Sequence, residues 1–367
     1  MIFALLVLSV IVVFHEFGHY LLARLNGIAV VEFSVGFGPR LLSWESKKSG
    51  TRYSWKLIPF GGSCAMLGSF DEETETEEEK AYREKYADGC CGVSFFEKSA
   101  LRRMSVIAAG PIFNFILALI AAVFVISWAG YDAPVLLDVT AGEAADAAGL
   151  QAGDKITKIG GRRMLLTRDC LLYMMTTEKE DIAIEYERMD ESSGVWNAYE
   201  TVIDGDQMRQ ESGRYYMGVS FSAYRVEAES IPALIRYAVA DVRYNVISVV
   251  ESLKMMFGGR LTGEEIAGPV RIVSIIDQTV EQAAPGGLIS VIMQILNLIV
   301  VFSANLGVMN LIPFPALDGG RLVFLLWELV TGRPVNQKVE GMISLIGMAL
   351  LMALMFLVIF NDIRILY

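Results

Sequence analysis

Two histidines and one glutamate near the amino terminus have the types and the spacing of a metal-dependent hydrolytic site. His15, Glu16 and His19 together read H-E-x-x-H. Residues four apart project from one face of a helix, so the two imidazoles can bind one zinc ion. Glu16 lies one position further round, where it can take a proton from a water molecule at the metal.

A third zinc ligand has to come from another residue type, because hydrolytic zinc sites usually take three protein ligands and leave one position for water. His15 and His19 are the only histidines in the sequence, which leaves a carboxylate or a cysteine. Asp318 is the best candidate, since it follows a proline-interrupted apolar segment and precedes two glycines. The alternative is that Asp318 only caps a helix predicted for Gly319–Leu329.

Three asparagines within apolar segments are candidates for a role in the site, because an amide group there needs a hydrogen-bonding partner. Asn305 and Asn310 precede Asp318 on the same element, and either can hold the backbone of a peptide substrate or orient a metal ligand. Their alternative role is hydrogen bonding between helices. Asn114 follows the small residues of Ala108–Gly110, which favour close helix packing, and a direct role in the site is its second interpretation.

Four segments are apolar and long enough to cross a membrane, which takes about 20 residues. They are Met1–Leu25, Met104–Trp128, Leu288–Ile312 and Gly341–Phe360. Ionisable groups are costly inside such a segment, so the histidines and the glutamate of the first one are expected to be functional.

Basic residues predict the orientation of these spans. The loop between the first two spans carries Lys and Arg next to both of them, and the loop between the last two spans carries Arg321, Arg333 and Lys338. The positive-inside rule makes both loops cytoplasmic. The region between the second and third spans then faces outward, as do both termini. His15 and His19 fall in the cytoplasmic half of the first span.

A small sheet is predicted between the first two spans. Its strands are expected at Val30–Val35, Arg40–Glu45 and Arg52–Ile58. The glycines at the strand ends are Gly36, Gly38, Gly61 and Gly62. A sheet edge at the membrane near the metal helix can hold an extended peptide by backbone hydrogen bonds, which makes these glycines candidate substrate-binding positions. A plain surface hairpin is the alternative, and the acidic stretch Asp71–Gly92 is expected to be a solvated loop.

The segment 134–225 has the mixed polar and apolar composition of a soluble domain, and its length is that of one small domain. Strands are expected at 135–139, 155–159, 182–188, 198–203 and 216–221, and helices at 144–148 and 167–175. The run Ala144–Ile156 resembles the P-A-x-x-A-G-L-x-x-G-D-x-I pattern of PDZ domains, with Ala144 at the usual proline position. PDZ domains take an extended peptide beside a strand and a helix. A small folded spacer is the alternative.

The composition indicates a membrane protein without a nucleic-acid partner. Of the 367 residues, 54% are hydrophobic, and the formal net charge is −11. The four cysteines, Cys64, Cys90, Cys91 and Cys170, have no zinc-finger or disulfide-framework spacing. The first apolar segment lacks a basic n-region and an A-x-A cleavage site, so we expect it to be retained as a span.

These patterns together predict a polytopic α-helical membrane protein of about four transmembrane helices, with a membrane-associated β-sheet and one extracytoplasmic PDZ-like α/β domain. The amphipathic stretch Ile231–Gly258 is expected either on the outer membrane face or packed on a neighbouring domain. The expected segments are 1–25 (first span), 26–103 (β region and acidic loop), 104–130 (second span), 134–225 (PDZ-like domain), 226–287 (amphipathic helix and loop), 288–320 (third span) and 321–367 (loop and fourth span).

The paired motifs resemble the site-2 protease family of zinc intramembrane proteases, and most closely its bacterial members that regulate sigma-factor signalling. The resemblance is carried by H-E-F-G-H at residues 15–19, by N-x-x-P-x-P-x-L-D-G-G at residues 310–320, and by the PDZ-like segment between them. The chain has room for one PDZ-like domain, whereas the best-known member has two in tandem.

The resemblance implies that His15, His19 and Asp318 bind zinc, that Glu16 is the catalytic acid and base, and that Asn310 helps to hold the substrate strand. It implies cleavage of single-pass transmembrane proteins in the bacterial plasma (inner) membrane, with lipid around the spans. The suggested substrates are anti-sigma factors after a first cleavage, or remnant signal peptides. The cut would fall on the cytoplasmic side, with the PDZ-like domain screening substrates outside.

Two other classes of function are compatible with parts of the sequence. A non-catalytic membrane scaffold would use the PDZ-like domain to collect peptides, but the intact Glu16 argues against it. A zinc transporter would need metal ligands spread along a pathway, whereas the sequence has one cluster of candidates.

Overall fold

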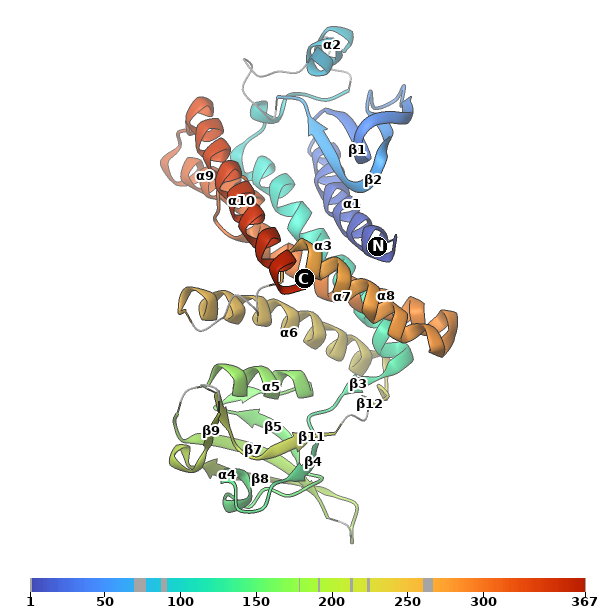
Figure 1. The fold of residues 1–367 in the computed structure, drawn as a ribbon. Coiled ribbons are helices and arrows are strands. Elements are labelled where there is room, and N and C mark those ends of the chain that lie inside the picture. Colours follow the sequence, from blue (N-terminus) through green and yellow to red (C-terminus); the bar gives the residue numbers. More distant parts are fainter. Residues whose placement is uncertain are drawn as a thin grey trace. The chain divides into compact units, whose positions relative to one another are not determined.

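The computed structural model describes residues 2–68, 77–86, 91–177, 179–190, 192–211, 214–222, 225–259 and 267–366. The chain forms two compact units. The first combines Met1–Ala121 with Leu261–Tyr367, and the second is Ala122–Arg260. The first unit therefore brings the two ends of the chain together, and with them both sequence motifs (Figure 1).

The α-helices are α1 (Ile2–Leu25), α2 (Glu77–Lys85), α3 (Ala100–Ala129), α4 (Ala144–Ala147), α5 (Thr167–Thr176), α6 (Ile231–Phe257), α7 (Pro269–Ala283), α8 (Gly287–Leu311), α9 (Asp318–Thr331) and α10 (Gln337–Leu366). The strands are β1 (Val30–Glu45), β2 (Arg52–Met66), β3 (Tyr131–Asp132), β4 (Leu136–Val139), β5 (Lys155–Ile159), β6 (Arg162–Arg163), β7 (Ile182–Met189), β8 (Trp196–Ile203), β9 (Arg209–Glu211), β10 (Arg214–Tyr216), β11 (Val219–Phe221) and β12 (Arg225–Val226). Short 3₁₀ turns occur at Phe95–Glu97, Gly205–Gln207 and Ala284–Gly286.

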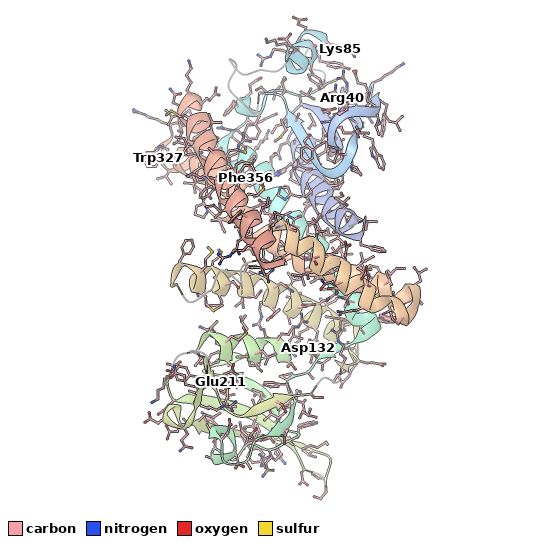
Figure 2. All side chains as sticks on the ribbon, in the orientation of Figure 1. Arg40, Lys85, Asp132, Glu211, Trp327 and Phe356 are labelled. Carbon is pink, nitrogen blue, oxygen red and sulfur yellow. The ribbon has the colours of Figure 1, made fainter. Side chains whose placement is uncertain are left out.

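Four helical segments of the described chain are long and apolar enough to cross a membrane. They are Phe3–Leu25, Ala100–Ala129, Pro269–Leu311 and Gln337–Ile365. Large apolar side chains on the late helices face outward, including Trp327 at 60% and Phe356 at 64% exposure (Figure 2). Such exposure is costly in water but favourable in lipid, so the fold is that of a polytopic membrane protein.

Two helices differ from the sequence-based expectation. A loop is expected before the third span, but α7 forms there and packs against α8. A loop is also expected at the start of the segment 321–367, but α9 lies there, close to the alternative helix at Gly319–Leu329. Both segments have an amphipathic pattern of helical period. In the sequence this pattern is hidden by residues that usually indicate turns. The Gly268-Pro269 pair begins α7, and Gly319 and Gly320 lie in the first turn of α9.

The expected short strands between the first two spans merge into one long antiparallel hairpin of β1 and β2. Gly36 and Gly38 have φ of 88° and 90°, and irregular register there lets the strand bend without ending. The hairpin packs on α1, beside it in Figure 1. The Tyr20 and Tyr53 hydroxyls lie 2.6 Å apart and join the helix to β2.

Part of the expected acidic loop is helical. Within it, α2 lies against β1, with Tyr82 buried and Lys85 Nζ 2.6 Å from Glu45 Oε1. The expectation of a loop is therefore wrong for Glu77–Lys85, because Tyr82 in the helix and Tyr86 directly after it pack in an apolar cluster. Residues 71–76 and 87–90 of the expected loop lie outside the described residues.

The second unit contains the predicted α/β pattern. Strands β5, β7 and β8 match the expected segments closely, and the order of the four-stranded sheet is β6-β5-β7-β8. The expected strand at 216–221 is divided between β10 and β11 by a turn at Gly218, which has φ of 77°. A core of buried side chains joins the sheet to α5 and includes Leu136, Ile156 and Ile184.

The amphipathic helix α6 packs on α5 of the same unit. Arg168 Nη1 lies 3.1 Å from Asp241 Oδ1, and Arg243 Nη2 lies 2.9 Å from Asp169 Oδ2. Burial acts to lower the pKa of Arg168, but the nearby carboxylates outweigh it and raise that pKa. These contacts favour packing against the predicted small domain, and a place on the outer membrane face stays a prediction.

Candidate metal centre

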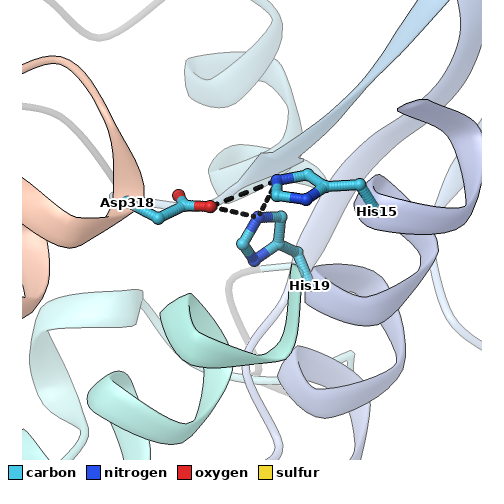
Figure 3. A group of neighbouring side chains, drawn as sticks. All are labelled: His15, His19 and Asp318. Carbon is cyan, nitrogen blue, oxygen red and sulfur yellow. Dashed lines mark hydrogen bonds and ion pairs between the residues drawn. The ribbon is translucent and has the colours of Figure 1, made fainter. Parts of the chain in front are cut away.

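Helix α1 presents His15 and His19 on one face, and Asp318 of α9 lies opposite them (Figure 3). The two Nε2 atoms are 3.1 Å apart, and Asp318 Oδ2 is 3.1 Å from His15 Nε2 and 3.4 Å from His19 Nε2. Ligands at about 2.0–2.1 Å from a tetrahedral zinc ion lie about 3.3–3.4 Å from one another. The three atoms therefore have the spacing of three corners of a zinc tetrahedron, and two imidazoles with one carboxylate are a suitable donor set.

A tight turn brings Asp318 to this position. Helix α8 ends at Leu311, and Ala316 then adopts a φ of 81°, which is rare for a residue with a side chain. A Cβ on Gly319 or Gly320 would collide with backbone carbonyl groups of the same turn, including one 2.5 Å away at Leu311. The two glycines of the L-D-G-G element are thus needed for the close turn. Asp318 is also the first residue of α9. It therefore lies in the first turn of a helix and belongs to the cluster at the same time.

Helix α3 fixes the ring of His19. The carbonyl oxygen of Val106 lies 2.9 Å from His19 Nδ1. A carbonyl can only accept a hydrogen bond, so Nδ1 carries the proton and the lone pair of Nε2 faces the cluster. This is the tautomer that a metal ligand bound through Nε2 needs.

Close packing of α3 on α1 makes this contact possible. An added Cβ on Gly18 would lie 2.9 Å from a ring carbon of Phe113, and one on Gly110 would lie 2.6 Å from Cε1 of His15. Both positions therefore require glycine. The sequence indicates close packing at Ala108–Gly110, but it contains no signal that a backbone carbonyl at Val106 serves the site.

Glu16 lies beside the three clustered side chains and is held by β2. The backbone N–H of Cys64 lies near its carboxylate. A Cβ on Gly62 would lie 3.6 Å from Glu16 Cγ, so the strand passes directly by the glutamate. Gly36, Gly38 and Gly61 have their nearest contacts within the hairpin, at Ile58 and Phe37, and a substrate role for them stays a prediction.

The three asparagines occupy different positions. Asn114 is fully buried and its Nδ2 lies 3.1 Å from His15 Nδ1, which favours the direct role over packing alone. Asn310 is partly buried, with Nδ2 3.5 Å from the same atom. Asn305 lies one and a half turns earlier on α8, and its Oδ1 is buried without a hydrogen-bond partner among the described residues.

Comparison with known proteins identifies the class to which this fold and site belong. The model of peptidase family M50 matches residues 3–354. The chain therefore belongs to this family, the site-2 proteases, and is a site-2 type zinc metalloendopeptidase of the membrane.

Particular relatives match over nearly their whole length. The zinc metalloprotease RasP of Bacillus licheniformis is 30% identical over 427 residues, covering 98% of this chain and 97% of that protein. The regulator of sigma-W protease RasP of Bacillus subtilis is 28% identical, with the same coverage of both chains. A zinc metalloprotease of Geobacillus kaustophilus, also named RasP, is 30% identical over 426 residues. The family and its zinc cofactor, as inferred from the two motifs, are confirmed.

Proposed function

We propose that this protease cleaves the transmembrane segments of single-pass membrane proteins, with His15, His19 and Asp318 as zinc ligands and Glu16 as the acid/base. The observation that carries the proposal is the convergence of the three ligand atoms, from α1 and α9, within 4.8 Å of one another. Their helices come from opposite ends of the chain, and two of the three residues are buried in spans of a membrane protein. Such groups are costly in lipid, so their presence in a span indicates a function.

Each residue has a distinct task in peptide hydrolysis. Zinc, when bound, supplies the Lewis acid that activates water and polarises the scissile carbonyl. Glu16 accepts the proton of the attacking water and returns it to the leaving amine. Strand β2, which passes Glu16 at Gly62, lies on one side of the Glu16 carboxylate. His19 keeps its Nε2 lone pair toward the cluster because Val106 accepts from its Nδ1.

The substrate segment has to unwind before it is cut, since a helical carbonyl is hydrogen-bonded and shielded. Strand β2 supports this step because it passes Glu16 at Gly62 and pairs only with β1 among the described strands. An extended peptide that adds to this sheet would recover the backbone hydrogen bonds that its helix loses. The amide of Asn310, partly buried beside His15, is available to bind the peptide backbone.

We further propose that the site opens to the cytoplasm and that the second unit is a PDZ-like domain outside the plasma membrane. Basic residues around the first and last loops support this orientation by the positive-inside rule. The four-stranded sheet, α5 and the Ala144–Ile156 pattern support the PDZ-like assignment. A relative bears the name regulator of sigma-W protease, which supports anti-sigma factors as substrates, after a first cleavage outside; remnant signal peptides are a second group.

The test compares the purified wild-type protein with Glu16→Gln in detergent, using a panel of single-span peptides. We expect about one zinc per chain in both proteins, because Glu16 is not a ligand, and cleavage by the wild type alone. Asp318→Ala is the matched variant, which should lose zinc as well as cleavage. Zinc binding without glutamate-dependent cleavage of any peptide would instead favour the non-catalytic scaffold.

A further inference from the structure

His15 differs from His19 in the partner of its Nδ1 atom. His19 has the carbonyl of Val106, which fixes its proton on Nδ1. The corresponding neighbour of His15 is the side-chain amide of Asn114, at 3.1 Å and with no exposure to solvent. Both partners come from α3, two turns apart on the helix.

The amide of Asn114 has two possible orientations, because its nitrogen and oxygen have nearly the same shape. With Nδ2 toward His15, the ring would have to present its Nδ1 lone pair and carry its proton on Nε2. That proton would then point at Asp318 and His19, where the ligand lone pair is needed. In the same orientation Asn114 Oδ1 is buried without a partner among the described residues, and buried polar atoms rarely lack one.

We propose that Asn114 is a positioning residue of the zinc site: its Oδ1 accepts the Nδ1–H of His15 and thereby fixes the tautomer that binds metal through Nε2. The inference rests on the zinc site proposed above. The flip gives the amide oxygen a donor and moves the amide nitrogen to the position that the oxygen leaves. It also makes the two imidazoles equivalent, each held by an acceptor from α3. Outer partners of this kind typically contribute about 10–100-fold to metal affinity or activity.

Asn114 is also well fixed for this task. Ser303 of α8 donates a hydrogen bond of 2.8 Å to the backbone carbonyl of Asn114, and both residues are fully buried. Gly307, one turn further along α8, allows close approach, since an added Cβ would lie 3.2 Å from the carbonyl of Pro111. Asn310 is a weaker candidate for the same role, because its amide lies 3.5 Å from His15 Nδ1 and is only partly buried.

Zinc affinity of the full-length protein in detergent tests the proposal by competition with a chelator. Asn114→Leu keeps the size of the side chain but removes the acceptor, and we expect affinity to fall by about 10–100-fold. Asn114→Asp keeps an acceptor and should restore most of the affinity. Ser127→Ala is the matched control on the same helix, since its hydroxyl donates only to the nearby backbone carbonyl of Phe124, more than three turns beyond Asn114, and its zinc affinity should equal that of the wild type.

The proton itself can be observed in the wild type, which avoids dependence on the folding of any variant. Because the chain has two histidines, ¹⁵N-histidine labelling gives two imidazoles to resolve. In the zinc-loaded protein both Nδ1 atoms should be protonated. An unprotonated His15 Nδ1 would overturn the proposal, as would unchanged zinc affinity in Asn114→Leu. A loss of affinity in Asn310→Leu with none in Asn114→Leu would transfer the role to Asn310. If the wild type binds zinc but cleaves no peptide, the proposed function fails while the positioning role stands.

Discussion

Asp318 Oδ2 lies 3.1 Å from His15 Nε2, although the two residues belong to helices at opposite ends of the chain. The contact closes the first unit, because α1 and α9 approach one another at this cluster. Three polar side chains within a membrane protein need either a bound cation or a shared proton to remain together. The contact between His15 and Asp318 therefore joins α1 to α9 and also forms part of the candidate metal site.

Removal of the third ligand gives the first prediction. Asp318→Ala should weaken zinc binding by more than the about 10–100-fold that an outer partner contributes, because a ligand itself is lost. Zinc content after dialysis and competition with a chelator measure the effect. Chelator treatment should abolish wild-type cleavage, and added zinc should restore it in the wild type but not in Asp318→Ala. Retained stoichiometric zinc in this variant would show that another residue is the third ligand.

Close packing at Gly110 gives the second prediction. The Cβ of Gly110→Ala would lie 2.6 Å from Cε1 of His15, so α3 has to move away or the ring has to rotate. We expect lower zinc affinity, lower activity and reduced thermal stability, since overpacking typically costs about 1–3 kcal/mol. Gly341→Ala is the matched control, because a Cβ there meets no atom within 4 Å and the residue lies in the second turn of α10. Equal melting temperatures and zinc affinities for both variants would contradict this packing.

Local patterns predicted much of the fold and two parts of the candidate site. The H-E-x-x-H spacing depends only on helical geometry, and the L-D-G-G element contains the glycines that its turn requires. Strands β5, β7 and β8 followed from alternation of apolar residues. These features were predictable because each one depends on residues close together in the sequence.

The contributions of α3 could not be derived in the same way. Val106 acts through its backbone carbonyl, which every residue type possesses, and Asn114 acts only because α3 packs tightly on α1. The merging of the expected short strands into one hairpin likewise depends on positive φ at Gly36 and Gly38, where glycine normally indicates an end. Long-range packing decided each of these cases.

The buried carboxylate of Glu32 gives the third prediction, on pH dependence. Burial acts to raise the pKa of Glu32, but hydrogen bonds from Arg40 (2.7 Å) and Ser54 (2.6 Å), with Lys56 nearby, lower it to about 2. A carboxyl whose pKa is lower in the folded state stabilises the fold above its unfolded pKa of about 4.3, and this stabilisation disappears as the pH falls toward 2. Melting temperatures should therefore separate the wild type from Glu32→Gln at pH 6 and converge as the pH falls below 4.

An exposed carboxylate provides the control for that experiment. Glu77 of α2 pairs with Lys80 at 2.8 Å, but its side chain is 90% exposed. Exposed ion pairs contribute little to stability, so the melting temperature of Glu77→Gln should equal that of the wild type at every pH. A difference between the wild type and Glu32→Gln that persists unchanged to pH 2 would contradict the role assigned to Glu32.

The beginning of α7 gives the last prediction. Its N-cap residue is Gly268, which has no side chain to accept from the first N–H groups of the helix. The fully buried Asp362 of α10 replaces that side chain, accepting hydrogen bonds from the backbone nitrogens of Gly268 (2.9 Å), Val270 (3.1 Å) and Arg271 (3.1 Å). The Gly268-Pro269 pair thus begins a helix whose cap comes from a distant residue near the carboxyl terminus.

Asp362→Ala should leave these N–H groups without an acceptor and destabilise the protein by about 1–2 kcal/mol, with faster hydrogen–deuterium exchange concentrated at the first turn of α7. Asp362→Asn retains an acceptor oxygen and loses only the favourable charge at the helix N-terminus, so its effect should be smaller. Zinc affinity should be unchanged in both, because Asp362 lies outside the metal cluster. If exchange in Asp362→Ala increases evenly along α7 and α10 instead of at the first turn, Asp362 acts by general packing of the two helices and the capping role is wrong.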